Sequence, residues 1–296
     1  MLREKQVHAG AGIALVRKLA AEGDRIFDVG RARELGATVG ISEGYLRQAL
    51  HHLVRSGWLI RIRKGLYAVS SAMPGVSPVH EFEVAMALVA PAAISHWSAL
   101  HYHGLTDQAP RKVFILTTTD ASVPRRAARN EDGYLVGSIP YHFVQIRPPR
   151  YFGTERVWIG DARVWMTDAE RTLMDGLSMP RYCGDFAEVL HAFRVCGERL
   201  DVERIISYSL RLGGVAAKRV GWVLEDMGIP AGRLAALLDV PVEGYRLLDP
   251  TGPSRGPCNS RWMIQENLPG IRTDHETTAR AAGGSEETPR NALGGP

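Results

Sequence analysis

The chain has 296 residues, 45% of them hydrophobic, which is enough for about two domains with apolar cores. No apolar stretch approaches the ~18 residues that cross a bilayer, and the first residues lack the apolar run of a signal peptide. The three cysteines, Cys183, Cys196 and Cys258, form no C-x-x-C pair, which argues against a disulfide framework or a zinc signature. We therefore expect a cytoplasmic protein without membrane contact.

Positive charge is concentrated at the start of the chain. Residues 1–70 contain 12 Lys and Arg against 6 Asp and Glu, although the whole chain has a net charge of only +4. The remainder is therefore slightly acidic. This asymmetry indicates a polyanion-binding N-terminal unit attached to a nearly neutral body.

The first 70 residues show three helical patterns. They cover residues 11–21, 28–35 and 43–55. Asp28 and Ser42 are suitable N-caps for the second and third helices, because their side chains can accept hydrogen bonds from the first turn. The third helix has a buried stripe of Leu46, Ala49, Leu50 and Leu53.

A basic hairpin follows the third helix. Ile60 and Ile62 alternate with Arg61 and Arg63, which is the period of a strand, and Lys64-Gly65 supplies the turn. Three short helices and a hairpin are the order of a winged helix-turn-helix. Residues 1–70 are therefore predicted to be a DNA-binding domain.

The rest of the chain mixes helices and strands. Residues 71–80 are rich in helix breakers and predict a linker, and residues 81–269 predict a mixed α/β domain. Helices are expected at 81–89, 94–102, 168–177, 185–195, 202–212, 215–227 and 231–238, strands at 112–118, 141–146 and 242–248, and a hairpin at 157–166. Residues 270–296 are Gly-rich and polar, and we expect disorder there. The predicted fold class is α+β.

The third helix and the hairpin carry the residues suited to DNA. Arg47 can bond guanine and Gln48 adenine, because a helix in the major groove presents such side chains to base edges. The other candidates are contacts to phosphates or bases: Ser42, Tyr45, His51, Arg55, Arg61, Arg63 and Lys64. The same pattern also fits a solvated helix face or a winged helix that binds protein.

Four segments, taken in order, resemble the AbiEi family of antitoxins. They are GWLIRIRKGLY at 57–67, AISHWSALHYHGL at 93–105, VWIGDARVWMTDAERTLMD at 157–175 and YRLLDPTGPSRGPCNSRW at 245–262. The resemblance implies an N-terminal winged helix whose third helix and wing contact DNA, followed by an antitoxin domain. It also implies repression of the protein's own operon through inverted repeats in the promoter, by two copies on one site.

The resemblance further implies a partner in function. Members of the family counter a nucleotidyltransferase-like toxin encoded beside them, in a type IV arrangement without a stable complex, and many act in phage defence. The resemblance gives no catalytic residue. The tail after residue 270 resembles no segment of the family.

One cluster in the second half is a further candidate for function. Glu170, Arg171 and Asp175 lie on one short predicted helix, where Arg171 and Asp175 are four positions apart and can pair. A role in helix capping and ion pairing is favoured over a direct part in countering the toxin. Thr167 is expected to cap this helix through a box with Glu170.

Signals for an enzyme are weak. His96, His101 and His103 lie close together, but without a supporting carboxylate pattern they predict packing rather than a zinc site. The sequence has no Glu-x-Lys of the expected nuclease type and no G-x-x-x-x-G-K phosphate loop. We expect no enzymatic activity, no cofactor and no metal. The alternatives left open are a stand-alone regulator with a ligand- or partner-binding domain and a nucleic-acid-modifying enzyme.

Overall fold

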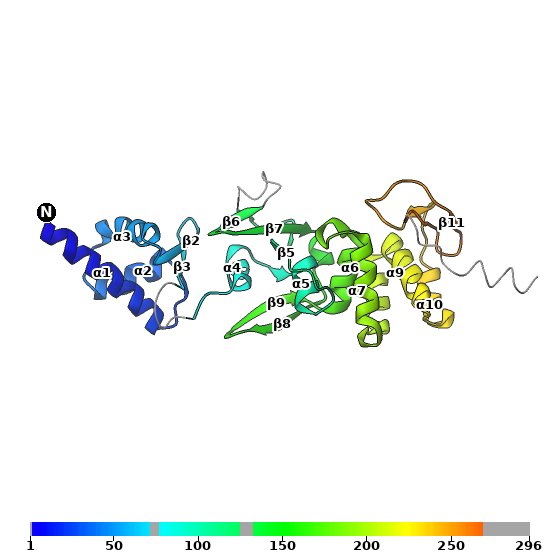
Figure 1. Cartoon of the computed structure of the whole chain (residues 1–296), viewed down its shortest axis with the longest axis horizontal. Helices are drawn as coiled ribbons and strands as arrows, with labels where there is room; N and C mark the ends of the chain where they lie inside the picture. The colour runs from blue at the N-terminus through cyan, green and yellow to red at the C-terminus, as the bar shows by residue number, and fades with distance from the viewer. Residues whose placement is uncertain (1, 72–76, 125–132, 269–296) are drawn as a thin grey trace, which may run out of the picture.

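The N-terminal part of the protein forms three helices and a small sheet (Figure 1). The structure, a computed structural model, describes residues 2–71, 77–124 and 133–268. The elements are α1 (Leu2–Ala21), β1 (Ile26–Asp28), α2 (Val29–Thr38), α3 (Glu43–Arg55), β2 (Leu59–Arg63) and β3 (Leu66–Val69). Strand β3 lies between β1 and β2 and is antiparallel to both. This is the winged helix-turn-helix that the sequence predicts.

The three helices pack on one apolar core. Buried leucines of α1 and α3 meet Leu59 and Val69 of the hairpin. Asp28 caps α2 as expected, since its side chain accepts a hydrogen bond of 2.8 Å from the Arg31 amide. Helix α2 continues to Thr38, beyond the expected end at Leu35 and through Gly36, which was expected to close it, and Gly40, with φ of +81°, supplies the turn to α3.

A six-stranded mixed sheet forms the middle of the molecule. Its strands have the order β6-β7-β5-β4-β9-β8. The elements are α4 (Glu81–Leu88), β4 (Ala93–Ile94), α5 (His96–Tyr102), β5 (Val113–Thr118), β6 (Tyr134–Val136), β7 (Ile139–Ile146), η1 (Pro148–Arg150), β8 (Thr154–Ile159) and β9 (Ala162–Thr167). The helix expected from residue 94 begins at His96, because Ala93 and Ile94 pair with β5 and β9 instead.

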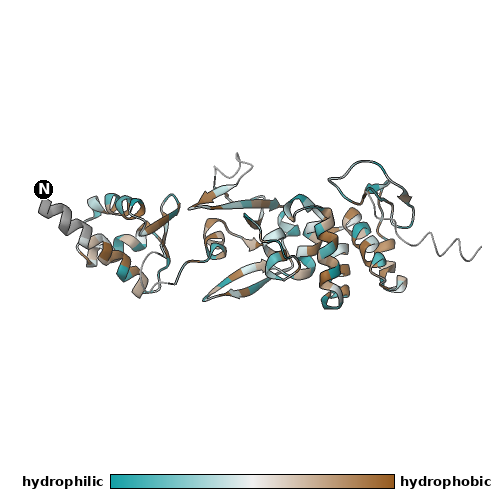
Figure 2. Ribbon diagram, in the orientation of Figure 1, coloured by the Kyte–Doolittle hydropathy of each residue, from teal (hydrophilic) through white to brown (hydrophobic). Residues whose placement is uncertain are grey.

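A layer of helices completes the chain. It consists of α6 (Ala169–Ser178), η2 (Pro180–Tyr182), α7 (Phe186–Cys196), η3 (Gly197–Arg199), α8 (Val202–Leu212), α9 (Gly214–Asp226) and α10 (Ala231–Leu238), followed by β10 (Arg246–Leu247), β11 (Cys258–Asn259) and β12 (Ile264–Gln265). Figure 2 shows the apolar stripes along α7, α9 and α10. The strand expected at 242–248 is reduced to the two residues of β10.

One tryptophan fixes the end of the described chain onto these helices. The indole of Trp262 is fully buried and lies over Gly221 of α9, where a Cβ atom would come within 2.0 Å of the ring. Its Nε1 donates a hydrogen bond of 2.6 Å to Glu225. Only glycine at position 221 therefore lets the indole pack this closely.

The fold class is α+β, as the sequence predicts. The predicted disordered tail, 270–296, and part of the predicted linker lie outside the described residues. Within the ranges given above, no helix is long and apolar enough to cross a membrane.

Candidate nucleic-acid interface

Helix α3 presents one apolar and one polar face. Its four predicted stripe residues are all buried, and Arg47, Gln48, His51 and Arg55 are all exposed. The bounds of α3, Glu43–Arg55, are those expected. The side chains that suit base edges therefore lie on the solvent face, while their contact with DNA stays a prediction.

The start of α3 differs from expectation in one detail. The Ser42 carbonyl accepts hydrogen bonds from the amides of Tyr45 and Leu46, but the Ser42 side chain makes no cap bond. Ser42 is exposed and its hydroxyl is not used to cap the helix, so a contact of this residue with a phosphate stays a prediction. Tyr45 is half-buried against the N-terminal core.

The wing is formed by β2 and β3. Arg61, Arg63 and Lys64 are exposed, and Gly65, with φ of +78°, makes the turn as predicted. The simple alternation of β2 was wrong, because a register shift between Arg61 and Arg63 leaves Ile60 37% exposed while Ile62 is 1% exposed.

The opposite side of the wing is covered by the middle of the molecule. Ile62 and Ala68 belong to the same apolar core as Val84 and Leu88 of α4. The Tyr134 hydroxyl donates a hydrogen bond of 2.8 Å to the Ile62 carbonyl (Figure 1 shows β6 beside β2). Sequence reasoning missed this contact; the available signal was the surplus of apolar residues on a hairpin that already supplies Leu59 and Val69 to its own domain.

An ion pair joins the same two parts of the chain. Arg25 contacts Glu83 of α4 at 2.8 Å, with 20% and 14% of the two side chains exposed. Together with the apolar contacts of Ile62 and Ala68, this pair joins the N-terminal domain to α4. The cationic side of the wing is left outward.

Several carboxylates of the N-terminal domain pair with arginines that belong neither to α3 nor to the wing. Arg31 pairs with Glu34, Asp24 and Glu22, and its pKa is raised chiefly by the hydrogen bonds that it donates to Glu34 and Asp24. Glu43 pairs with Arg33 at 3.0 Å. Among the described residues, the exposed cations of α3 and the wing form no ion pair: Arg47, Arg55, Arg61, Arg63 and Lys64. Their charge remains available to a polyanion.

The cluster in the second half is buried. Glu170, Arg171 and Asp175 are 4%, 1% and 3% exposed, which places all three inside the fold. Arg171 and Asp175 pair as their spacing predicts, with Nε to Oδ1 at 3.0 Å. Arg171 also donates to the carbonyls of Arg150 and Phe152, at 2.7 and 2.8 Å.

The capping box expected at this helix was wrong by one residue. Asp168, not Thr167, caps α6, and its side chain accepts a hydrogen bond of 2.8 Å from the Arg171 amide. Glu170 instead accepts a hydrogen bond of 2.9 Å from the Asp201 amide, and its Oε2 lies 3.5 Å from Nη1 of Arg204. These contacts join α6 to α8 and make the cluster part of the framework.

The three histidines near α5 do not converge. His96 is fully buried and burial lowers its pKa to about 4, while His103 Nε2 lies 2.8 Å from the Thr167 carbonyl. His101 is exposed. Within the described ranges, no group of three His, Cys, Asp or Glu side chains could hold a metal ion.

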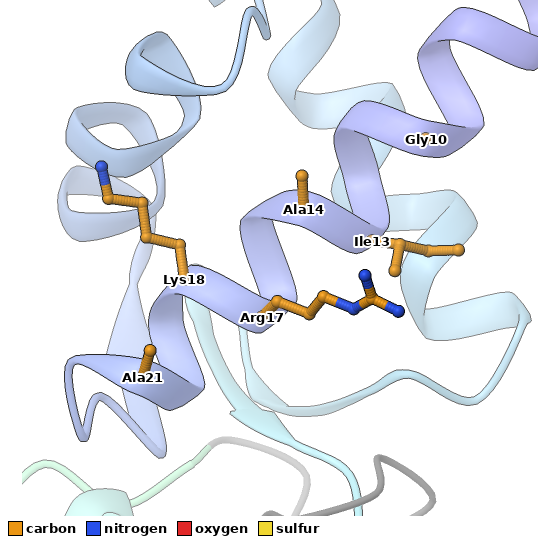
Figure 3. Close-up of a pocket in the computed structure, with 6 residues that line it drawn as sticks. All are labelled: Gly10, Ile13, Ala14, Arg17, Lys18 and Ala21. Atoms are coloured by element: carbon orange, nitrogen blue, oxygen red, sulfur yellow. The ribbon is translucent and has the colours of Figure 1, made fainter.

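A shallow depression of about 620 Å³ runs along α1 (Figure 3). Its lining comes from one side of this helix: Gly10, Ile13, Ala14, Arg17, Lys18 and Ala21. Figure 3 shows the Arg17 and Lys18 side chains pointing in different directions. The lining has no carboxylate, thiol or imidazole, and the depression offers no catalytic chemistry.

The exposed polar face of α3 and the basic wing define the class of the N-terminal domain. It is a winged helix-turn-helix of the kind found in DNA-binding transcriptional regulators. Residues 14–70 match the family of the AbiEi antitoxin, described as a transcriptional regulator. The N-terminal domain is thus an AbiEi-type winged helix, and the family match does not extend past residue 70.

A solved structure shares the wider fold. The RV2827C protein from Mycobacterium tuberculosis superimposes with a TM-score of 0.65 at 15% identity, covering 88% of this chain and 92% of that one. At this identity the likeness concerns the fold alone. No curated protein matches the sequence.

Proposed function

We propose that the protein is a DNA-binding antitoxin that represses its own operon through inverted repeats in the promoter. The proposal rests on the exposed cations of α3 and the wing, which form no ion pair within the described part of the chain, in a domain of the AbiEi type. Helix α3 enters the major groove, where Arg47 and Gln48 meet base edges. Arg55, Arg61, Arg63 and Lys64 contact phosphates on either side.

The second half of the proposal concerns the toxin. The protein counters a nucleotidyltransferase-like toxin encoded by the adjacent gene, in the cytoplasm and without a stable complex between the two. The buried state of Glu170, Arg171 and Asp175 supports a structural part for these residues in that domain. The protein itself has no catalytic role in the proposal.

A footprint on the upstream DNA tests the repressor. We expect protection of an inverted repeat in the promoter, with affinity that falls steeply as salt rises, because bound phosphates release their counterions. Arg17→Ala, which removes an exposed cation of α1 outside the proposed interface, is the matched control and should leave the footprint unchanged. Absence of protection at low salt would contradict the proposal.

A growth-rescue assay tests the antitoxin separately. Expression of the adjacent gene should slow growth, and co-expression of this protein should restore it. A neighbouring gene with no effect on growth would favour a regulator without antitoxin function.

A further inference from the structure

The most exposed aromatic residues of the sheet lie together on the β8–β9 hairpin. Trp158 is 62% exposed and Trp165 is 44% exposed. Across the two strands, Trp158 lies opposite Arg163 and Arg156 lies opposite Trp165. Each guanidinium lies over the facing indole, at 5.4 and 5.7 Å from the ring centroid. One face of the hairpin is therefore a checkerboard of arginine and tryptophan.

This checkerboard ends at an open edge of the sheet. Strand β8 is the last strand in the order, with β9 on one side and no strand on the other among the described residues (Figure 1). The hairpin turns through two residues, Gly160 and Asp161, so Ile159 and every second residue before it hydrogen-bond to β9. The residues between them, Arg156 and Trp158, therefore direct their N–H and C=O groups away from β9, toward the open edge. Exposed edges of this kind accept a further strand.

The sequence of β8 is complementary to itself. If two copies of β8 pair antiparallel about Val157, Arg156 of one copy lies opposite Trp158 of the other. Across the four strands β9, β8, β8 of the second copy and β9 of the second copy, the side chains then alternate as Trp165, Arg156, Trp158 and Arg163. This alternation continues the pairing found within each hairpin. Pairing about Arg156 instead would place two arginines opposite each other, which is unfavourable.

We propose that β8 is a homodimerisation edge, and that two copies of this chain join their sheets through antiparallel β8 strands centred on Val157. The alternation of arginine and tryptophan selects the second copy as the occupant, because the register that aligns the backbone groups also places each Arg156 over a partner indole, as the cation–π pairs within the hairpin do. Tryptophan and arginine are the residue types that contribute most at such contacts. The edge is short, so the dimer is weak and concentration-dependent.

The inference deepens the proposed function, in which two copies occupy an inverted repeat. Its test is made without DNA, so that failure of the dimer and failure of DNA binding are distinguishable. It uses the full chain in a Cys258→Ser background, because Cys258 is exposed whereas Cys183 and Cys196 are buried.

The register predicts one specific crosslink. Val157→Cys places two thiols directly opposite each other on the two-fold axis, in a close pair that a disulfide can span. Ile159→Cys is the matched control, because residue 159 lies opposite residue 155 and its two thiols stay about 14 Å apart. Mild oxidation should give a covalent dimer for Val157→Cys alone. Equal crosslinking of both variants, or of neither, would overturn the register.

Sedimentation equilibrium tests the surface itself. Trp158→Arg sets two arginines opposite each other and should weaken self-association roughly tenfold or more. Leu135→Arg makes a similar change at the other edge strand, β6, where Leu135 is 62% exposed, and should leave association unchanged. A chain that stays monomeric at several hundred micromolar, or a dimer indifferent to Trp158→Arg, would overturn the proposal. Thermal unfolding of both variants checks that they are folded.

Discussion

Arginine serves opposite purposes in two parts of the molecule, the N-terminal domain and helix α6. On α3 and the wing, Arg47 and Arg63 are exposed and form no ion pair among the described residues. On α6, Arg171 is 1% exposed, and its Nε and Nη1 groups donate hydrogen bonds to Asp175 and to two backbone carbonyls. The free arginines are available to a ligand, whereas the buried one holds the fold together.

The contrast has a physical origin. A buried charge loses its solvation by water and is tolerated only when it is paired and hydrogen-bonded. If one partner of such a pair is removed, the other stays buried without compensation for its lost solvation. An exposed charge keeps its solvation and contributes little to stability.

The largest effect is expected at the buried pair. Arg171→Ala leaves Asp175 charged and unpaired and two carbonyls unsatisfied, and should lower the free energy of unfolding by about 3–5 kcal/mol. Urea unfolding measures it. Arg233→Ala, which breaks the exposed pair with Glu203, is the control and should cost less than about 1 kcal/mol. Similar losses in the two variants would contradict the contrast.

A double variant sharpens this result. Arg171→Met with Asp175→Leu removes both charges and should recover much of the stability lost by Arg171→Ala, because no unpaired charge remains. A double variant as unstable as the single one would show that the carbonyl contacts, rather than the ion pair, matter most.

The second effect is a pH dependence of stability. Burial lowers the pKa of His96 to about 4, against 6.5 in the unfolded chain, so the unfolded state binds more protons between these values. Stability is therefore fully present above pH 6.5 and falls as the pH drops toward 4, by about 3 kcal/mol from this group.

A comparison of variants isolates the histidine. Asparagine tolerates the φ of +50° found at His96, so His96→Asn should fold and lose this part of the pH dependence. His51→Asn, at an exposed position of α3, should keep it. Unfolding curves of the two variants and the wild type at several pH values measure the difference. The same dependence of the free energy of unfolding on pH in the wild type and in His96→Asn would refute the role of His96.

The third effect concerns base recognition. Arg47→Ala should reduce discrimination by about 1–3 kcal/mol at one base position, because a bidentate contact to guanine is lost. Competition binding with single-base variants of the operator measures it. Arg63→Ala should weaken all duplexes alike, since phosphates carry no sequence. An equal loss of affinity of Arg47→Ala for all duplexes would contradict a role of Arg47 in base recognition.

The smallest effect distinguishes two helix starts. Asp28 caps α2, so Asp28→Ala should cost about 1 kcal/mol in the free energy of unfolding. The Ser42 side chain makes no cap bond, so Ser42→Ala should leave stability nearly unchanged. Chemical denaturation of both variants tests this, and a clear loss for Ser42→Ala would show that its hydroxyl caps α3 in solution.

Local patterns predicted much of the interface. The bounds of α3, its buried stripe and the Lys64-Gly65 turn all follow from spacing and from the conformational freedom of glycine. The Arg171–Asp175 pair follows from helical spacing. Each of these features depends on residues close in sequence.

Features that depend on distant partners could not be predicted. The register shift that exposes Ile60 and the docking of Ile62 on α4 reflect packing across the chain. Burial of Glu170 depends on α8, some 30 positions later. A single sequence carries no direct record of which distant surfaces meet.

Salt dependence of operator binding tests the central claim most directly. The unpaired cations of the wing should each release counterions, so replacing Arg61 and Arg63 together by alanine should reduce the slope of log K against log salt by about 2. We expect a steep slope for the wild-type protein and this smaller slope for the variant. An unchanged slope, or no binding of the wild type at low salt, would contradict it.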